Sequence, residues 1–88
     1  MEVRGMAAKK VGSVEHYYDH IGVALVKFTG TVKVGETIKF IGKSGEFTQT
    51  VDSLEFEHQK VQSAKKGDSL GLKVDQKVRE GDLVYKIT

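Results

Sequence analysis

One short motif recurs three times in this chain and limits what it can fold into. A basic residue, any residue, a glycine and an acidic residue occur in order within VKVGETIKF (residues 32–40), AKKGDSL (64–70) and VREGDLV (78–84). The chain has ten glycines and no proline, so its turns depend on the freedom of glycine at positive φ. We expect Gly35, Gly67 and Gly81 to reverse the chain, each just before a new strand. The motif therefore predicts short strands joined by tight turns.

Apolar and polar residues alternate between the glycines as they do in strands. Leu70 and Leu72 share one face, which excludes Lys73. In the run 46–56 the apolar positions change parity, which predicts a bulge or bend near residues 52–53. The predicted strands are residues 11–18, 22–28, 37–41, 46–56, 69–74 and 83–87.

Six short strands with almost no helix must be closed or stacked, because exposed strand edges promote aggregation. The sequence therefore predicts an all-β fold, a six-stranded closed barrel. Residues 1–9 show no periodicity and predict a loose tail, and residues 10–88 predict one domain.

The composition excludes several classes of protein. With 39% hydrophobic and 30% charged residues, the 88-residue chain is typical of one folded domain, and it has no apolar run long enough to span a membrane. Its first residues lack the apolar stretch of a signal peptide. The absence of cysteine is typical of a reducing compartment. We therefore expect a cytoplasmic protein without membrane attachment.

The order of these parts resembles the second domain of translational GTPases such as elongation factor Tu. The segments that carry the resemblance are IGVALVKFTGTVKVGETIKFIG, VDSLEFEHQKVQSAKKGDSLGL and VREGDLVYKI, and together they span about residues 10–87. The resemblance implies a six-stranded Greek-key barrel of the translation-factor domain II type.

The same resemblance implies a binding module without enzymatic activity, with RNA, the ribosome or a partner protein as its target. No G-x-x-x-x-G-K-[ST] motif is present, so nucleotide binding is not expected. Glu55 and His58 fall where the family places a glutamate and an arginine against the end of aminoacyl-tRNA. Histidine in place of arginine removes a permanent bidentate phosphate donor.

Aromatic and titratable side chains are densest in EHYYDHIG (residues 15–22). His16, Tyr17 and Tyr18 could stack nucleobases, or one tyrosine could plug the end of the barrel. His16 and His20 stand too far apart on a strand to share a metal ion. We therefore predict no metal and no cofactor.

Lys39, Lys73 and Lys86 occupy polar positions of predicted strands and could form a stripe that follows a phosphate backbone, or could simply confer solubility. Two other functions stay open: a lipoyl- or biotinyl-type carrier modified at Lys60, and a subunit that docks on another protein. No spacing matches a catalytic signature, so we expect no enzymatic activity.

Overall fold

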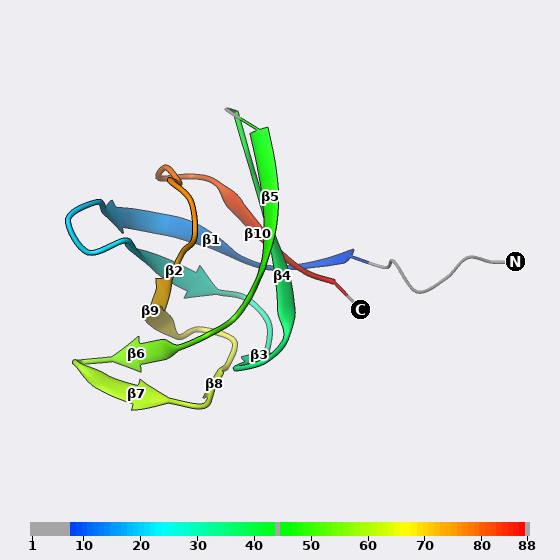
Figure 1. The fold of residues 1–88 in the computed structure, drawn as a ribbon. Helices are drawn as coiled ribbons and strands as arrows, with labels where there is room; N and C mark the ends of the chain where they lie inside the picture. The colour runs from blue at the N-terminus through cyan, green and yellow to red at the C-terminus, as the bar shows by residue number, and fades with distance from the viewer. Residues whose placement is uncertain (1–7, 44, 88) are drawn as a thin grey trace, which may run out of the picture.

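The computed structural model describes residues 8–43 and 45–87, and these residues form β-strands and no helix (Figure 1). The all-β prediction is confirmed. The strands are β1 (Ala8–Tyr18), β2 (Val23–Phe28), β3 (Val32–Lys33), β4 (Thr37–Gly42), β5 (Gly45–Thr50), β6 (Leu54–Phe56), β7 (Gln59–Val61), β8 (Ser63–Ala64), β9 (Ser69–Lys73) and β10 (Leu83–Ile87).

Eight strands form one antiparallel sheet in the order β5-β4-β10-β1-β2-β9-β6-β7, and β3 pairs with β8. The long strand β1 lies between β2 and β10, with register shifts at Lys10/Gly12 and Val14/His16 that let it curve. Its first residue, Ala8, pairs with Ile87 near the end of β10. The two ends of the fold therefore lie side by side (Figure 1).

The prediction of a closed six-stranded barrel is wrong. In the described ranges β5 and β7 are the outermost strands, and no backbone pairing joins them. The run 46–56 breaks between β5 and β6, near residues 52–53 as the change of parity predicts. Because β6 then pairs with β9 and folds back on β7, the chain leaves the seam beside β5 without a partner strand.

A buried side chain bridges that seam. Gln49 of β5 is only 5% exposed. Its Nε2 donates a hydrogen bond to the carbonyl of Lys73 (2.9 Å), and its Oε1 accepts one from the N–H of Asp75 (2.8 Å). One amide thus pairs with two backbone groups, one at the end of β9 and one just beyond it.

The three glycine turns share one hydrogen-bond pattern. In each, the acidic residue donates its N–H to the carbonyl of the basic residue three positions earlier, and its carboxylate accepts that residue's N–H. The pairs are Lys33 with Glu36 (3.1 and 2.7 Å), Lys65 with Asp68 (3.0 and 2.9 Å) and Arg79 with Asp82 (3.1 and 2.9 Å). The φ angles of Gly35, Gly67 and Gly81 are 98°, 95° and 92°, a region that glycine enters without a Cβ clash.

We call these three turns, residues 33–36, 65–68 and 79–82, the clamp turns. Each clamp turn also forms hydrogen bonds to a buried residue from another part of the chain. The glycine N–H donates to that residue's carbonyl, and the carbonyl of the acidic residue accepts its N–H, at 2.7–2.9 Å. The residues held are Val51 by Gly35–Glu36, Phe28 by Gly67–Asp68 and Val14 by Gly81–Asp82. The motif is repeated because each copy fastens a strand to a distant core residue.

The core lies on the concave face of the sheet and consists almost entirely of aliphatic side chains and phenylalanines. Phe28, Phe40 and Ile38 are the largest side chains that are fully buried. Phe40 stacks on the half-buried Phe47 of the neighbouring strand β5, with ring centroids 5.0 Å apart.

Two sequence predictions concern the start of the chain and membranes. Most of the predicted tail, residues 1–7, lies outside the described residues, whereas Ala8 and Lys9 already belong to β1. Over the described ranges there is no helix with the length and apolarity needed to cross a membrane.

Candidate functional site

The outer face of strands β2, β9 and β6 carries a row of dissimilar residues. Leu25 of β2 pairs with Gly71 of β9, and Gly71 pairs with Glu55 of β6. Because alternate residues of a strand point to opposite faces, these three face away from the core. An aliphatic side chain and a carboxylate therefore flank a position with no side chain.

Gly71 is not required by the backbone. It lies within a regular strand, and its φ is outside the left-handed region. A Cβ built there would meet Val23 Cγ1 at 3.3 Å and the Glu55 carbonyl at 3.8 Å, so a small side chain would fit with slight movement of Val23. At Gly12, by contrast, a Cβ would lie 2.7 Å from the Lys27 carbonyl. The missing side chain at Gly71 leaves a hollow instead of relieving a clash.

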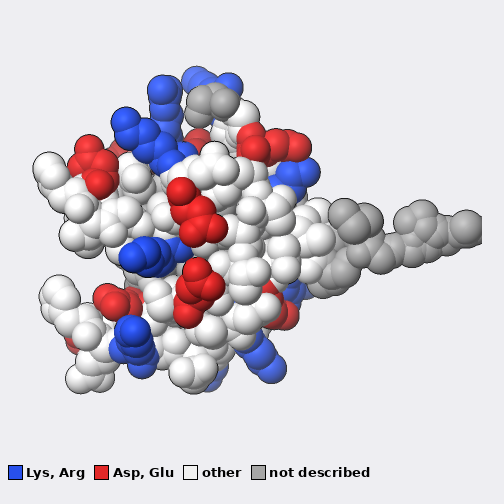
Figure 2. Space-filling model, in the orientation of Figure 1, with Lys and Arg blue, Asp and Glu red and all other residues white. Residues whose placement is uncertain are grey.

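Two hollows that share Ile21, Val23, Glu55 and Gly71 meet on this face, and we call them together the Gly71 groove. It opens between the β1–β2 turn and the β6–β7 hairpin, where Figure 2 shows a notch at the left edge of the molecule. The groove is lined by Tyr18, Ile21, Val23, Leu25, Ser53, Glu55, Glu57, His58, Ser69, Gly71 and Lys73.

One wall of the groove is apolar and exposed. Tyr18 and Ile21, at the β1–β2 turn, are two large hydrophobic side chains of this wall, and they are 45% and 63% exposed. Gly22, with φ of 65°, ends this turn, and its N–H donates to the Tyr18 carbonyl at 2.9 Å. The turn therefore holds Ile21 outward beside Val23 and Leu25.

The opposite wall is a strained hairpin. Glu57 and His58, which connect β6 to β7, have φ of 50° and 68°, the conformation of a two-residue turn that glycine and asparagine normally provide. Non-glycine residues in this region cost about 1 kcal/mol or more each. The hairpin thus presents a glutamate and a histidine to the groove at a cost in stability.

The charge of the groove differs between its two ends. Its lining beside Tyr18 contains Glu55 and Glu57 and no lysine or arginine. Among the described residues, neither carboxylate forms an ion pair. Lys73 lies at the other end, beside Ser53. The lining near Tyr18 is therefore apolar on one side and carries two carboxylates on the other, and Lys60 of β7 lies just beyond it, paired opposite Glu55.

The structure brings several of the predicted site residues together here. Glu55, His58, Tyr18 and Lys73 all line the groove. His16 lies next to it, with its ring 4.5 Å from that of Tyr18 and its Nδ1 2.9 Å from Glu80 Oε2. The sequence interpretation missed Gly71, Ile21, Val23 and Leu25. A glycine at an outward position of an alternating strand was the signal that could have found the groove.

Other predicted residues lie elsewhere. Tyr17 packs against the core. Lys39 pairs with Glu46 across β4 and β5 at 3.0 Å, and Lys86 donates to the Thr31 carbonyl at 2.9 Å.

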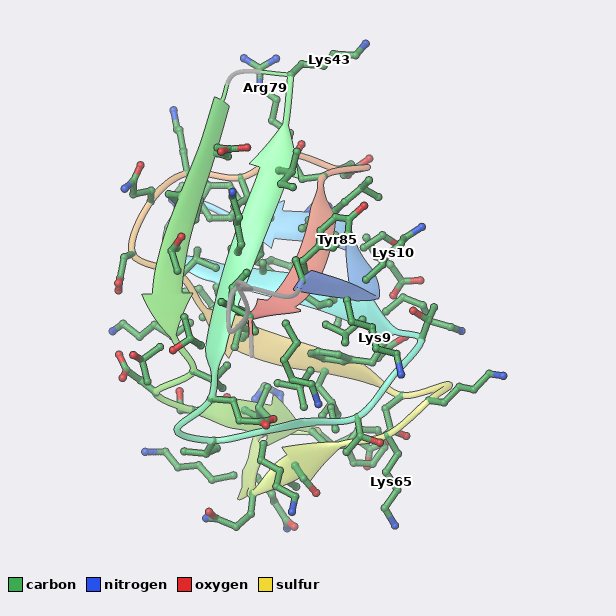
Figure 3. All side chains as sticks on the ribbon, turned by 90° about the vertical axis from the view of Figure 1, so that its right-hand side faces the viewer. Lys9, Lys10, Lys43, Lys65, Arg79 and Tyr85 are labelled. Atoms are coloured by element: carbon green, nitrogen blue, oxygen red, sulfur yellow. The ribbon has the colours of Figure 1, made fainter. Side chains whose placement is uncertain are left out.

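The cations do not gather into one stripe. Lys39 of β4 and Lys86 of β10 lie on neighbouring strands but point to opposite faces, because Lys86 pairs with Ile38. Lys73 of β9 is separated from β10 by β1 and β2. Figure 3 shows other cations equally dispersed, with Lys43 and Arg79 at one end of the molecule and Lys65 at the other.

The described residues match neither the metal site nor the carrier lysine that the sequence analysis considered. His20 and Asp19 approach to 3.8 Å, but within the described part of the chain no three histidine, aspartate or glutamate side chains could hold a metal ion. Lys60 lies within β7, opposite Glu55, and the hairpin tip is formed by Glu57 and His58. A carrier lysine would be at the tip.

Comparison with solved structures defines the class of fold. Two crystal structures of the C-terminal domain of a Geobacillus thermoleovorans protein assigned to the U32 peptidases superimpose on this chain. Their TM-scores are 0.82 and 0.83, with 20% and 21% sequence identity. They cover 86% and 89% of this chain, and it covers 96% and 91% of theirs.

Sequence comparison identifies the family. The chain is 38% identical over 89 residues to an uncharacterized protease of Methanocaldococcus jannaschii, and 32% identical over 78 residues to a collagenase of Porphyromonas gingivalis. These matches cover 96% and 86% of this chain but only 22% of each relative. Residues 8–84 match the family described as the peptidase family U32 C-terminal domain, and the chain belongs to that family.

These findings correct three predictions. The resemblance to elongation factor Tu is wrong, because the family match covers nearly the whole chain and the similar structures are U32 C-terminal domains. The assignment as an RNA- or ribosome-binding module, with its carrier and docking-subunit alternatives, is overturned by the same match. The expectation of no enzymatic activity is overturned by relatives named protease and collagenase.

Proposed function

We propose that this domain serves a U32-type peptidase by holding a segment of polypeptide substrate in the Gly71 groove. The observation that carries the proposal is the vacant outward position of Gly71 between an apolar wall and an acidic one. The names of the relatives support a polypeptide as the ligand, since proteases and collagenases act on polypeptides. The chain spans about a fifth of those relatives (22%), so cleavage itself is assigned to the larger protein as part of the proposal.

The dimensions of the groove support an extended segment. Its side walls rise from β2 and β6, which lie on either side of β9 and are therefore about 10 Å apart, two strand spacings. That width accommodates one extended chain or one large side chain above Gly71. Apolar linings with a few polar groups at the rim are typical of ligand sites.

The exposed side chains support the same use. Tyr18 and Ile21 are large, hydrophobic and open to solvent at the groove, and exposed apolar patches in folded domains often mark interaction sites. We therefore propose that a bound polypeptide covers the side chains of Tyr18 and Ile21. We also propose a cytoplasmic location, for which the cysteine-free composition is the support.

The proposal is tested by binding of unfolded polypeptides to the 88-residue chain. Surface plasmon resonance with immobilised gelatin and with reduced, carboxymethylated α-lactalbumin measures the dissociation constants. We expect saturable binding that weakens about tenfold in Gly71→Val, which corresponds to about 1.4 kcal/mol.

Thr48→Val, on the edge strand β5, is the matched control and should bind like the parent chain. Absence of binding to both ligands, or equal binding by Gly71→Val and the parent, would refute the proposal. Circular dichroism of each variant verifies that it is folded.

A further inference from the structure

The distribution of charge in the Gly71 groove indicates which segments it selects. The lining near Tyr18 carries two carboxylates, Glu55 and Glu57, and no lysine or arginine. Both side chains are exposed, so their charges are available to a ligand. A ligand that passes between Tyr18 and Glu57 therefore meets an apolar surface on one side and negative charge on the other.

We infer that the groove selects extended polypeptide segments in which an apolar side chain is flanked by lysine or arginine. This inference rests on the proposed function and specifies its substrate class. The apolar side chain lies above Gly71, in contact with Val23 and Leu25. The neighbouring cation faces Glu55 and Glu57, where an acidic side chain would be repelled.

The strained hairpin supports a role for Glu57 beyond connecting two strands. A two-residue turn is ordinarily made with glycine or asparagine, yet here a glutamate and a histidine adopt positive φ. This conformation holds Glu57 at the mouth of the groove. Backbone strain that is retained at a ligand-binding wall agrees with use of the side chain for recognition.

The tyrosine on the facing wall adds to the same preference. Tyr18 lines the groove beside the two carboxylates, and it is 45% exposed. Guanidinium and ammonium groups bind favourably over a tyrosine ring. A cationic side chain in the groove would thus have partners on both walls.

Four fluorescein-labelled nonapeptides in a glycine–serine background provide the test, with fluorescence anisotropy as the readout. Three contain a central phenylalanine flanked by arginine, serine or glutamate, and the fourth places arginines around a central serine. We expect the arginine–phenylalanine peptide to bind most tightly and the glutamate–phenylalanine peptide least tightly. The difference in affinity between the arginine–phenylalanine and the glutamate–phenylalanine peptides should shrink as salt rises from 50 to 500 mM, because screening weakens exposed charge pairs.

Charge-removing variants identify the carboxylates. Each of Glu55→Gln and Glu57→Gln should weaken the arginine–phenylalanine peptide about two- to fivefold, the range of exposed ion pairs, and leave the serine-flanked peptide unchanged. Glu46→Gln, on the distant strand β5, is the matched control and should leave all four affinities unchanged.

The possible failures are distinguishable. If none of the peptides with phenylalanine binds, the proposed polypeptide-binding function fails. If these three bind equally, or if Glu55→Gln and Glu57→Gln leave the arginine preference intact, polypeptide binding stands and the inferred charge selection is overturned. If the arginine–serine peptide binds as tightly as the arginine–phenylalanine peptide, the apolar part of the inference is overturned.

Discussion

The three neighbouring strands β2, β9 and β6 have an inner and an outer face that are built in opposite ways. On the inner face Ala24, Leu72 and Leu54 are completely buried. On the outer face the paired residues Leu25, Gly71 and Glu55 surround a hollow. One stretch of sheet thus combines a filled core with a vacant surface, and the difference separates residues that stabilise the fold from residues available for binding.

The largest loss of stability should come from shortening a buried side chain on the inner face. Leu72→Ala leaves a cavity and should lower the free energy of unfolding by about 2–5 kcal/mol. Leu25→Ala, on the half-buried outer face, should cost about 1 kcal/mol or less, because the site is already open to solvent. Urea denaturation of both variants makes the comparison, and equal losses would show that the two faces do not differ.

The seam beside β5 should be the next most sensitive place. Gln49→Leu leaves the Lys73 carbonyl and the Asp75 N–H without their partner, and we expect a loss of about 1–3 kcal/mol. Gln62→Leu, at an exposed position, is the control and should change stability by less than about 0.5 kcal/mol. Urea denaturation of both variants measures the difference, and a Gln49→Leu protein as stable as the parent would mean that water replaces the amide.

A smaller effect, this time an increase in stability, is expected from a substitution in the strained hairpin. His58→Gly relieves a positive φ and should raise the free energy of unfolding by up to about 1 kcal/mol. Gly81→Ala, which introduces strain at a clamp turn, should lower it by about 1 kcal/mol or more. Thermal unfolding followed by circular dichroism measures both shifts, and a destabilised His58→Gly would show that the imidazole makes a favourable contact.

The smallest effect on stability should come from the groove floor. Gly71→Ala adds a Cβ at an ordinary strand φ, 3.3 Å from Val23 Cγ1, and should change the free energy of unfolding by about 1 kcal/mol at most, because the gain from replacing a strand glycine and the displacement of Val23 oppose each other. The matched substitution Gly12→Ala should be clearly destabilising, since its Cβ would meet a backbone oxygen at 2.7 Å. If the two alanines behave alike in urea, Gly71 has a structural role that its surroundings do not indicate.

Local parts of the fold were predictable from the sequence. Alternation identified the core residues Leu70 and Leu72, and the change of parity after Val51 placed the break between β5 and β6. Such signals are local, because side-chain direction depends only on position along a strand. The β6–β7 hairpin was not predicted, since Glu57 and His58 carry no turn signal.

The overall architecture was harder to predict from the sequence. Whether a sheet closes depends on pairing between strands distant in sequence, and the Gln49 amide that bridges the seam looks like any polar strand residue. The family was misassigned for a related reason. The glycine–acid clamp turns at Gly35, Gly67 and Gly81 solve a general problem of small β-folds, so their order does not identify one family.

The candidate site was partly predictable. Glu55 and His58 were selected for a resemblance that proved wrong, Tyr18 for the density of aromatic residues around it and Lys73 as a polar strand position, yet all four line one groove. Lys39 and Lys86 were chosen only because they are polar positions of strands, and their partners lie elsewhere. Gly71 was missed because its outward position in an alternating strand is only a weak signal, and the residues that surround the hollow come from strands distant in sequence.

The pairing of Ala8 with Ile87 has a consequence for any larger polypeptide that contains this domain. A chain that continues beyond both strands would enter and leave at one point, on the opposite side from the two hairpins that border the groove (Figure 1). The domain would then be attached to the rest of that polypeptide at one end, with the Gly71 groove at the end that faces away from the attachment.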